Sequence, residues 1–311
     1  MKKLFIIDGG AGRTIAAIPA LLKYAKKDND FGIFVNWWDA LLWGIPELQD
    51  KVFNPEQKGV FEHVACKAEE VVSPEPYRVP GYFKQEKSLA EAFDYLINNT
   101  NDHSDLGAPI LKTSKMEKIG AAGMLQDVKN NQQKQKTIVL QPFGRSAQKH
   151  PTGTIIDESS RSLDPQSYLK LVKKLSTKYN LVLMSEQDFH MAEDTYTMKP
   201  QADLRMWAAF IDAADYFIGV DSVGQHMARA MNKCGTVIVG STFSINTTYP
   251  NYFNIVEKKD VKKYSPIRIS GLESHLADRA NDTLMDFSNE EINTMYSNLS
   301  LIHISEPTRP Y

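Results

Sequence analysis

The block of residues 219–228 combines side chains that suit the binding of phosphate. An apolar run ends at Asp221 and Ser222, and His226 follows four residues after the serine. Asp221 or Ser222 can cap a helix that begins here, and the small residues at its start leave backbone amides open to a phosphate. His226, one turn into that helix, would face the same loop. Without a ligand, Asp221 would be a helix cap only and His226 a core histidine bonded to a carbonyl oxygen.

A second loop places two arginines among hydroxyl groups. Gly144 and Arg145 follow the apolar run 137–141, and Arg161 lies in a serine-rich segment ahead of the helical pattern that begins at residue 165. A guanidinium group beside free amides at helix N-termini suits a diphosphate. Each arginine taken alone would be a solvated loop residue, since arginine side chains are mostly exposed.

The first apolar run of the chain ends in a glycine turn. Asp8 is followed by Gly9 and Gly10, and Gly12 stands directly before Arg13. Glycines let the backbone approach a ligand closely, and the next helix offers free N–H groups to an anion. The turn lacks the GxGxxG spacing, and no acidic residue stands directly at the end of the second strand pattern, which argues against a nucleotide-dependent oxidoreductase. A tight turn without a ligand is the alternative.

These three loops follow strands and precede helices. Helical patterns alternate with strand patterns along the chain, the latter at 3–7, 30–35, 137–141, 180–184, 216–220 and 236–239. Such alternation is typical of α/β proteins with parallel sheets and crossover helices. Open sheets of this kind bind ligands at the carboxyl ends of their strands, where all three loops would lie.

A polar stretch divides the pattern into two halves. Residues 127–136 are Lys, Asn, Gln and Asp, with Val128 as the single apolar residue. This composition is typical of a linker. We therefore predict one domain over 1–130 and another over 137–285, each with its own sheet. A closing helix is expected at 286–299, with Ile292 and Met295 facing inward.

The loops resemble those of family 9 glycosyltransferases, the lipopolysaccharide heptosyltransferases and their relatives. Residues 9–13 and 18–21 resemble the family's opening glycine loop and its "TPAL" helix. Asp221 and Ser222, with His226 and Ala228, resemble its "D-S/T-G-x-x-H-x-A" block, and 240–242 resembles the "G-P-T" that follows the next strand. Arg161 falls where the family often has a basic residue. The similarity runs in order from about residue 1 to 256.

The resemblance implies a GT-B fold, in which two Rossmann-like parallel-sheet domains face each other across a cleft. It implies that the C-terminal domain binds a nucleotide-diphosphate sugar and that the N-terminal domain receives a glycan or lipid-linked glycan acceptor, with inversion at the transferred sugar. It implies no cofactor and no metal, because backbone amides and basic side chains neutralise the leaving diphosphate. The chemistry of the loops and the resemblance together give these candidate residues for the donor: Gly144, Arg145, Arg161, Asp221, Ser222, Val223, Gly224 and His226.

The chain departs from the family pattern at the position of the general base. The family usually has an aspartate where this chain has Arg13, and arginine stays protonated and cannot accept a proton. Val223 stands where the family has glycine, with Gly224 one place later. Three hypotheses follow: Asp8 is the base from a shifted position, Arg13 binds an anionic acceptor, or the chain is a catalytically degenerate sugar-nucleotide-binding protein.

Composition restricts the remaining classes of function. The net charge of -2 argues against a general nucleic-acid-binding protein, which usually has a basic excess. The apolar run 4–7 is too short to span a membrane, and two cysteines in 311 residues suit a reducing compartment, so we expect a cytoplasmic protein without a transmembrane segment. Residues 300–311 match none of the patterns and read as a non-native tail.

Overall fold

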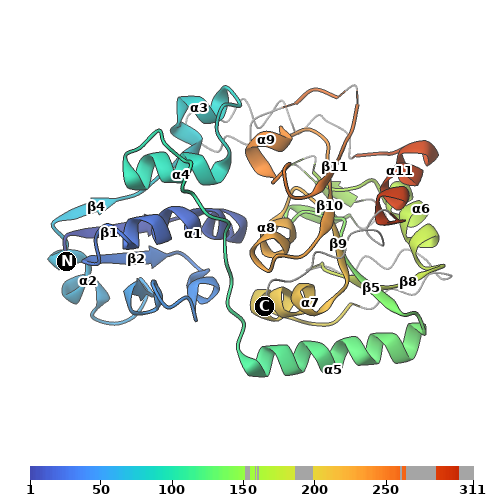
Figure 1. The fold of residues 1–311 in the computed structure, drawn as a ribbon, viewed down its shortest axis with the longest axis horizontal. Coiled ribbons are helices and arrows are strands. Elements are labelled where there is room, and N and C mark those ends of the chain that lie inside the picture. Colours follow the sequence, from blue (N-terminus) through green and yellow to red (C-terminus); the bar gives the residue numbers. More distant parts are fainter. Residues whose placement is uncertain are drawn as a thin grey trace.

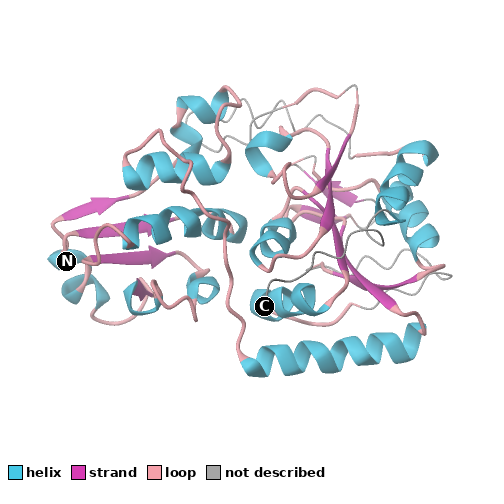
Figure 2. Ribbon diagram, viewed as in Figure 1, coloured by secondary structure: helices cyan, strands magenta, loops and turns pink. Residues whose placement is uncertain are grey.

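The computed structural model describes residues 1–150, 155–157, 159, 161–185, 199–259, 261–263 and 285–300. Two separate parallel sheets, one of four strands and one of five, organise this part of the chain (Figure 1). Helices cover both faces of each sheet (Figure 2). The prediction of two Rossmann-like parallel sheets is therefore confirmed.

The first sheet has the order β3-β2-β1-β4. Its strands are β1 (Lys3–Ile7), β2 (Phe31–Val35), β3 (Val52–Phe53) and β4 (Glu70–Val72). Alternate side chains of β1 point to opposite faces, because successive residues of a strand do so. Phe5 and Ile7 pack beneath α1 (Ala11–Ala25) and α4 (Leu89–Asn98), whereas Leu4 packs beneath α2 (Val60–His63).

Short helical turns fill the connections of this half. They are η1 (Asp39–Leu42), η2 (Gln49–Lys51), η3 (Ala65–Lys67), η4 (Pro76–Arg78) and α3 (Pro80–Phe83). The proline-rich segment 73–83 contains two of these turns, η4 and α3. Proline is compatible with a helix start, since the first helical residues have no intrahelical partner for their N–H groups.

The second sheet has the order β11-β10-β9-β5-β8. Its strands are β5 (Lys136–Gln141), β8 (Tyr179–Leu183), β9 (Tyr216–Val220), β10 (Gly235–Val239) and β11 (Asn254–Glu257). One face is covered by α6 (Pro165–Leu175) and α11 (Asn289–Ser300). The other is covered by α5 (Lys115–Gln132), α7 (Leu204–Ala213) and α8 (Val223–Ala230).

The smaller elements of the second half are α9 (Ser244–Thr247) and an antiparallel pair, β6 (Ala147–Lys149) and β7 (Ile155–Asp157). In α11, Ile292 and Met295 are buried against α6, which confirms the predicted closing helix and its inward face. The proposed tail lies outside the described residues from 301 onward.

The linker predicted at 127–136 is wrong, because α5 continues through Gln132. Ser114 and Glu117 form a capping box at its start, and only Ala121, Leu125 and Val128 are buried. Such a narrow apolar stripe leaves most of the helix polar, which is why its composition resembled a linker. The crossing between the two halves is instead the segment 99–114, which contains no helix or strand (Figure 1). The domain limits 1–130 and 137–285 stay a prediction, although α5 packs against α7 and β8.

The two halves are held together by packing and by two polar clamps. A single apolar cluster extends from Phe5 in β1 to Phe217 in β9. The amide of Asn246 donates to the carbonyl oxygens of Tyr82 and Lys87, at 3.0 and 2.9 Å.

Arg205, at the start of α7, makes the second clamp. Its guanidinium donates to both carboxylate oxygens of Glu117, at 2.6 and 2.9 Å. It also donates to the carbonyl oxygens of Ala40, in the first half, and Lys112, in the crossing segment, at 2.7 and 2.8 Å. The bond to Arg205 lowers the pKa of Glu117 to about 2, against the opposing effect of burial.

Arg205→Lys is expected to lower the free energy of unfolding by about 1–3 kcal/mol. A lysine keeps the charge, but its single nitrogen does not reproduce the planar fork, in which three nitrogens of Arg205 reach the carboxylate and the two carbonyl groups. Urea unfolding at neutral pH measures the change, with the exposed Arg78→Lys as control. A variant as stable as the parent would mean that the clamp contributes nothing to holding the halves together.

Candidate active site

A cleft of about 1080 Å³ lies between the two sheets. Loops that follow β1, β5 and β9 line it. In the first sheet β2 and β4 lie on opposite sides of β1, and in the second β8 and β9 lie on opposite sides of β5. Ligands of open α/β sheets bind at such reversals of strand order. The cleft is thus built from the reversal points of both sheets.

The first turn of α8 is capped by a side chain from a neighbouring strand. The amide nitrogen of Gly224 donates to Oε1 of Gln141, at the end of β5, at 2.8 Å. Nε2 of the same glutamine lies 3.4 Å from the hydroxyl of Ser222. Ser222 occupies the N-cap position without a side-chain cap bond, so the prediction of an Asp221 or Ser222 cap is wrong. The Gly224 amide is occupied by its bond to Gln141, whereas Ser222 and Val223 line the cleft.

The buried carboxylate of Asp221 is directed toward polar partners on three sides. It accepts hydrogen bonds from Nε2 of Gln225 at 3.0 Å and from the hydroxyl of Thr242 at 2.9 Å. Nη1 of Arg161 lies 3.9 Å from its second oxygen. Nε of Arg161 is buried without a partner in the described part of the chain. Asp221 therefore lies within ion-pair distance of a cleft-lining guanidinium whose Nε has no partner among the described residues.

His226 connects the two halves at the floor of the cleft. Its Nδ1 lies 2.9 Å from the hydroxyl of Tyr249, so it is not the carbonyl-bonded core histidine of the alternative interpretation. Burial lowers the pKa of His226 to about 4, which leaves the ring neutral at pH 7. A Cβ at Gly12 would come 2.8 Å from His226 Cδ2. Glycine at position 12 is thus required by close packing of α1 on α8.

The loop after β5 is shaped by a buried carboxylate. Asp157 accepts from the hydroxyl of Ser146 at 2.6 Å and from the amides of Ser159 and Ser162, at 2.8 and 3.0 Å. The hydroxyl of Ser162 in turn accepts from the amide of Gly144 at 2.9 Å. Burial alone would raise the pKa of Asp157, but these bonds lower it. The Gly144 amide and the serines are therefore occupied within the protein.

The structural roles of Gln141 and Asp157 were not predicted from the sequence. The partner of Gln141 at α8 is 83 positions away, so no local signal identifies it. Asp157 had a usable signal, since serines follow it at 159, 160 and 162, and a buried carboxylate needs such donors.

Arg145 reaches across the cleft to the first half. Its guanidinium lies 5.2 Å from the ring centre of Trp38, and Nε1 of Trp38 donates to the carbonyl oxygen of Gly9 at 3.0 Å. The glycine turn and the loop after β5 are thereby linked through one indole ring.

The glycine turn is shorter than predicted, because α1 begins at Ala11 and includes Gly12 and Arg13 in its first turn. Gly9 has a φ of +100°, a conformation that favours glycine. A Cβ at Gly10 would meet no atom within 4 Å, so this residue faces open space in the cleft.

Arg13 lines the cleft but is paired within the protein. Its Nη1 and Nη2 both lie 3.3 Å from Oε2 of Glu75, which follows β4, and its guanidinium stacks 4.8 Å from the ring centre of Tyr77. Nε of Arg13 is buried without a partner in the described residues.

Asp8 lies beside the cleft. Its Oδ1 accepts from the side-chain amide of Asn36 at 3.1 Å and from the amide nitrogen of Gly9 at 2.7 Å, and these bonds lower its pKa. The carboxylate is exposed and is not among the described residues that line the cleft.

The described residues contain no group of three His, Cys, Asp or Glu side chains that could hold a metal ion. None of the described helices has the length and apolar character needed to cross a membrane.

The fold matches solved glycosyltransferase structures. No family model and no curated protein matches the chain by sequence. A family 9 glycosyltransferase from Veillonella parvula superposes with a TM-score of 0.69 over 97% of this chain and 98% of its own, at 11% identity. The E. coli ADP-heptose lipopolysaccharide heptosyltransferase II gives 0.61 over 96% and 100%, at 14% identity. TibC, an iron-containing dodecameric glycosyltransferase of enterotoxigenic E. coli, gives 0.64 over 98% and 80%, at 11% identity. The predicted GT-B fold is thereby confirmed, and it is the fold of the family that the loops resemble.

Proposed function

We propose that this protein transfers a sugar from a nucleotide-diphosphate donor to a glycan or lipid-linked glycan acceptor, with inversion and without a metal. The observation that carries the proposal is the placement of Arg161. Its guanidinium lies 3.9 Å from the buried carboxylate of Asp221 at the reversal point of the second sheet, on the wall of a cleft large enough for a nucleotide sugar. A cation fixed in such a position stabilises the negative charge that develops on a leaving diphosphate.

His226 is proposed to donate the second bond to the diphosphate. Burial raises the pKa of Tyr249, so its hydroxyl keeps its proton and can donate to Nδ1 of His226. The proton of the neutral ring then sits on Nε2, which is a donor. Ser222 and Arg145, which also line the cleft, complete the proposed donor site.

Two of the solved structures with this fold indicate which nucleotide to test first. TibC was also solved with ADP-D-β-D-heptose, and the similar E. coli enzyme is an ADP-heptose transferase. We propose an ADP-sugar as the donor on this basis. The cytoplasm is the proposed compartment, because Cys66 and Cys234 are both free thiols.

The first half is proposed to receive the acceptor. Asp8 would be the base, since its lowered pKa keeps it ionised at neutral pH. Oδ1 is bonded on two sides, which fixes the direction of the carboxylate. Arg13 would bind an anionic group of the acceptor in competition with Glu75.

A specific observation favours a second candidate function, that of a catalytically silent sugar-nucleotide-binding protein. The position of the family base is occupied by Arg13, which is paired with Glu75, and Asp8 lies outside the cleft lining. The two candidates share the donor site and differ in turnover.

Arg161→Ala is expected to weaken donor binding by about 1.5–3 kcal/mol, or roughly 10- to 150-fold in Kd, because it removes a charge-assisted bond to the diphosphate. Isothermal titration against ADP-, GDP- and UDP-sugars measures the loss. EDTA is expected to leave binding and transfer intact. Arg78→Ala, an exposed arginine outside the cleft lining, is the matched control. Equal affinities of Arg161→Ala and the parent would return Arg161 to the role of a solvated loop residue.

A further inference from the structure

Trp37 is an exposed aromatic side chain on the wall of the cleft. Its side chain is 79% exposed, although a tryptophan buries more apolar surface than any other residue when it is covered. Trp38 and Trp207 also line the cleft, so three of the four tryptophans of the chain gather there. The fourth, Trp43, directly follows η1, six residues after Trp37, and is not part of the lining.

The backbone of Trp37 is held in an unfavourable conformation. Its φ is +69°, in the left-handed region that bulky side chains rarely adopt. Both neighbours are anchored: Asn36 donates to Asp8, and Trp38 donates to Gly9 and carries the Arg145 guanidinium on its ring. Strain of this kind persists where the surrounding structure imposes it, and it concentrates at ligand-binding sites.

We propose that Trp37 is a stacking platform for a pyranose ring of the acceptor. An indole ring has a negative face, which attracts the polarised C–H groups on one side of a sugar ring. The platform requires no charge, so it is distinct from the interaction proposed for Arg13. The inference rests on the proposed function only in calling the sugar the acceptor.

The position of the platform also fits the proposed base. Asn36 bonds the Asp8 carboxylate at 3.1 Å and is joined directly to Trp37. Trp37 therefore stands next in the chain to a residue that bonds the proposed base, and it lies on the half of the molecule opposite the donor site proposed at Arg161.

Three substitutions of Trp37 test whether its aromatic face binds a sugar ring. Trp37→Phe keeps a smaller aromatic face, Trp37→Leu keeps apolar bulk without that face, and Trp37→Asn suits the left-handed backbone but removes both. Trp43→Leu is the matched control, since Trp43 is 53% exposed, lies outside the cleft lining and has an ordinary φ of -63°.

The probe is a panel of methyl hexopyranosides at millimolar concentration, observed by saturation-transfer difference NMR. At least one is expected to receive saturation on the protons of one ring face. Dissociation constants should rise about 3- to 10-fold in Trp37→Leu and Trp37→Asn, and less in Trp37→Phe. Trp43→Leu should match the parent. Trp37→Asn should also raise Tm by about 2 °C, because it relieves the backbone strain.

Three outcomes would overturn the platform: no methyl hexopyranoside binds, Trp37→Leu binds as well as the parent, or Trp43→Leu loses as much as Trp37→Leu. Stacking that depends on Trp37 in a protein without transferase activity would sustain the platform and refute the proposed function. Transfer that is unaffected by Trp37→Leu would refute the platform and leave the proposed function standing.

Discussion

Asp8→Asn is expected to lower turnover by about 10²–10⁴-fold, the usual contribution of a general base. The amide keeps the shape of the carboxylate and its contact with the Gly9 amide, but it cannot accept a proton from the acceptor hydroxyl. Donor affinity is expected to stay the same, since Asp8 belongs to the first half and the proposed donor site to the second. Steady-state rates at saturating donor, together with titration of the donor, separate the two effects.

Asp127→Asn is the control for a lost carboxylate, because Asp127 is exposed on α5. Parental turnover in Asp8→Asn would remove Asp8 from the mechanism. Donor binding without transfer to any acceptor by the parent protein would leave the silent binding protein as the function.

Arg13→Asp helps to separate these two functions. It introduces the carboxylate of the family pattern beside Glu75, which loses its cation. If Arg13 binds an anionic acceptor, like-charge repulsion is expected to abolish transfer. A gain of activity in this variant would instead show that Arg13 had replaced a lost base.

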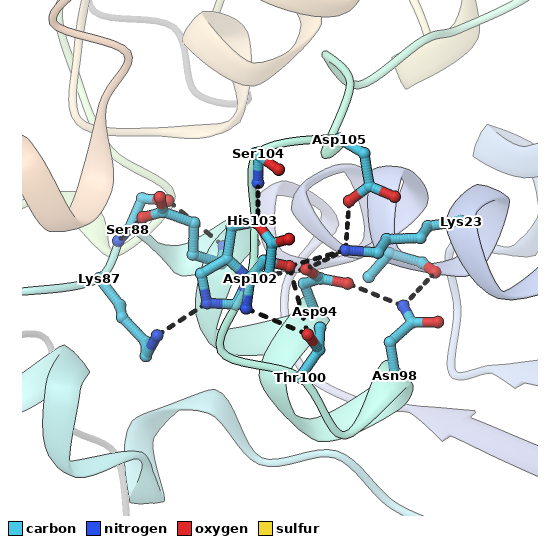
Figure 3. A network of polar contacts seen from close by, with 12 residues as sticks. Lys23, Lys87, Ser88, Asp94, Asn98, Thr100, Asp102, His103, Ser104 and Asp105 are labelled. Carbon is cyan, nitrogen blue, oxygen red and sulfur yellow. Dashed lines mark hydrogen bonds and ion pairs between the residues drawn. The ribbon is translucent and has the colours of Figure 1, made fainter.

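Asp94→Ala is expected to lower the free energy of unfolding by about 3–5 kcal/mol, because the buried ammonium group of Lys23 then loses its buried partner and keeps only the exposed carboxylate of Asp105. Asp94 is fully buried and lies 3.1 Å from Nζ of Lys23, which is itself buried (Figure 3). It also accepts from Nδ2 of Asn98 at 2.8 Å and lies 2.7 Å from Nδ1 of His103. Chemical denaturation followed by circular dichroism measures the loss.

The matched control replaces both charges by apolar residues. Lys23→Met with Asp94→Leu is expected to recover much of the lost stability, since neither charge then remains buried and alone. A single Asp94→Ala variant within about 1 kcal/mol of the parent would mean that water or Asp105, which also pairs with Lys23, replaces the carboxylate.

The polar network around Asp94 also joins three segments of the first half. Lys23 comes from α1 and Asp94 from α4, whereas His103 belongs to the start of the crossing segment 99–114 (Figure 3). Lys87 can only donate, so Nε2 of His103, 2.7 Å away, is the acceptor and Nδ1 carries the proton toward Asp94. The same network thus fixes the point at which the chain leaves the first half.

The amino-acid sequence by itself determined the elements whose signal is local. β1 and β9 were predicted at their observed limits, because a continuous apolar run bounded by polar or small residues identifies a buried strand. The inward face of α11 followed from the spacing of Ile292 and Met295 in the same way. The resemblance of the loops to one family also led to the confirmed fold.

Only the tertiary structure decided which polar groups meet. Glu75 pairs with Arg13 across 62 positions, and Gln141 caps α8 across 83, so neither partner can be inferred from its neighbours in the chain. The polar half of α5 was mistaken for a linker, because its three buried residues make a stripe too narrow to dominate its composition. Periodicity records which face of an element is apolar, whereas the partners of a charge depend on strand order and on how the two sheets meet.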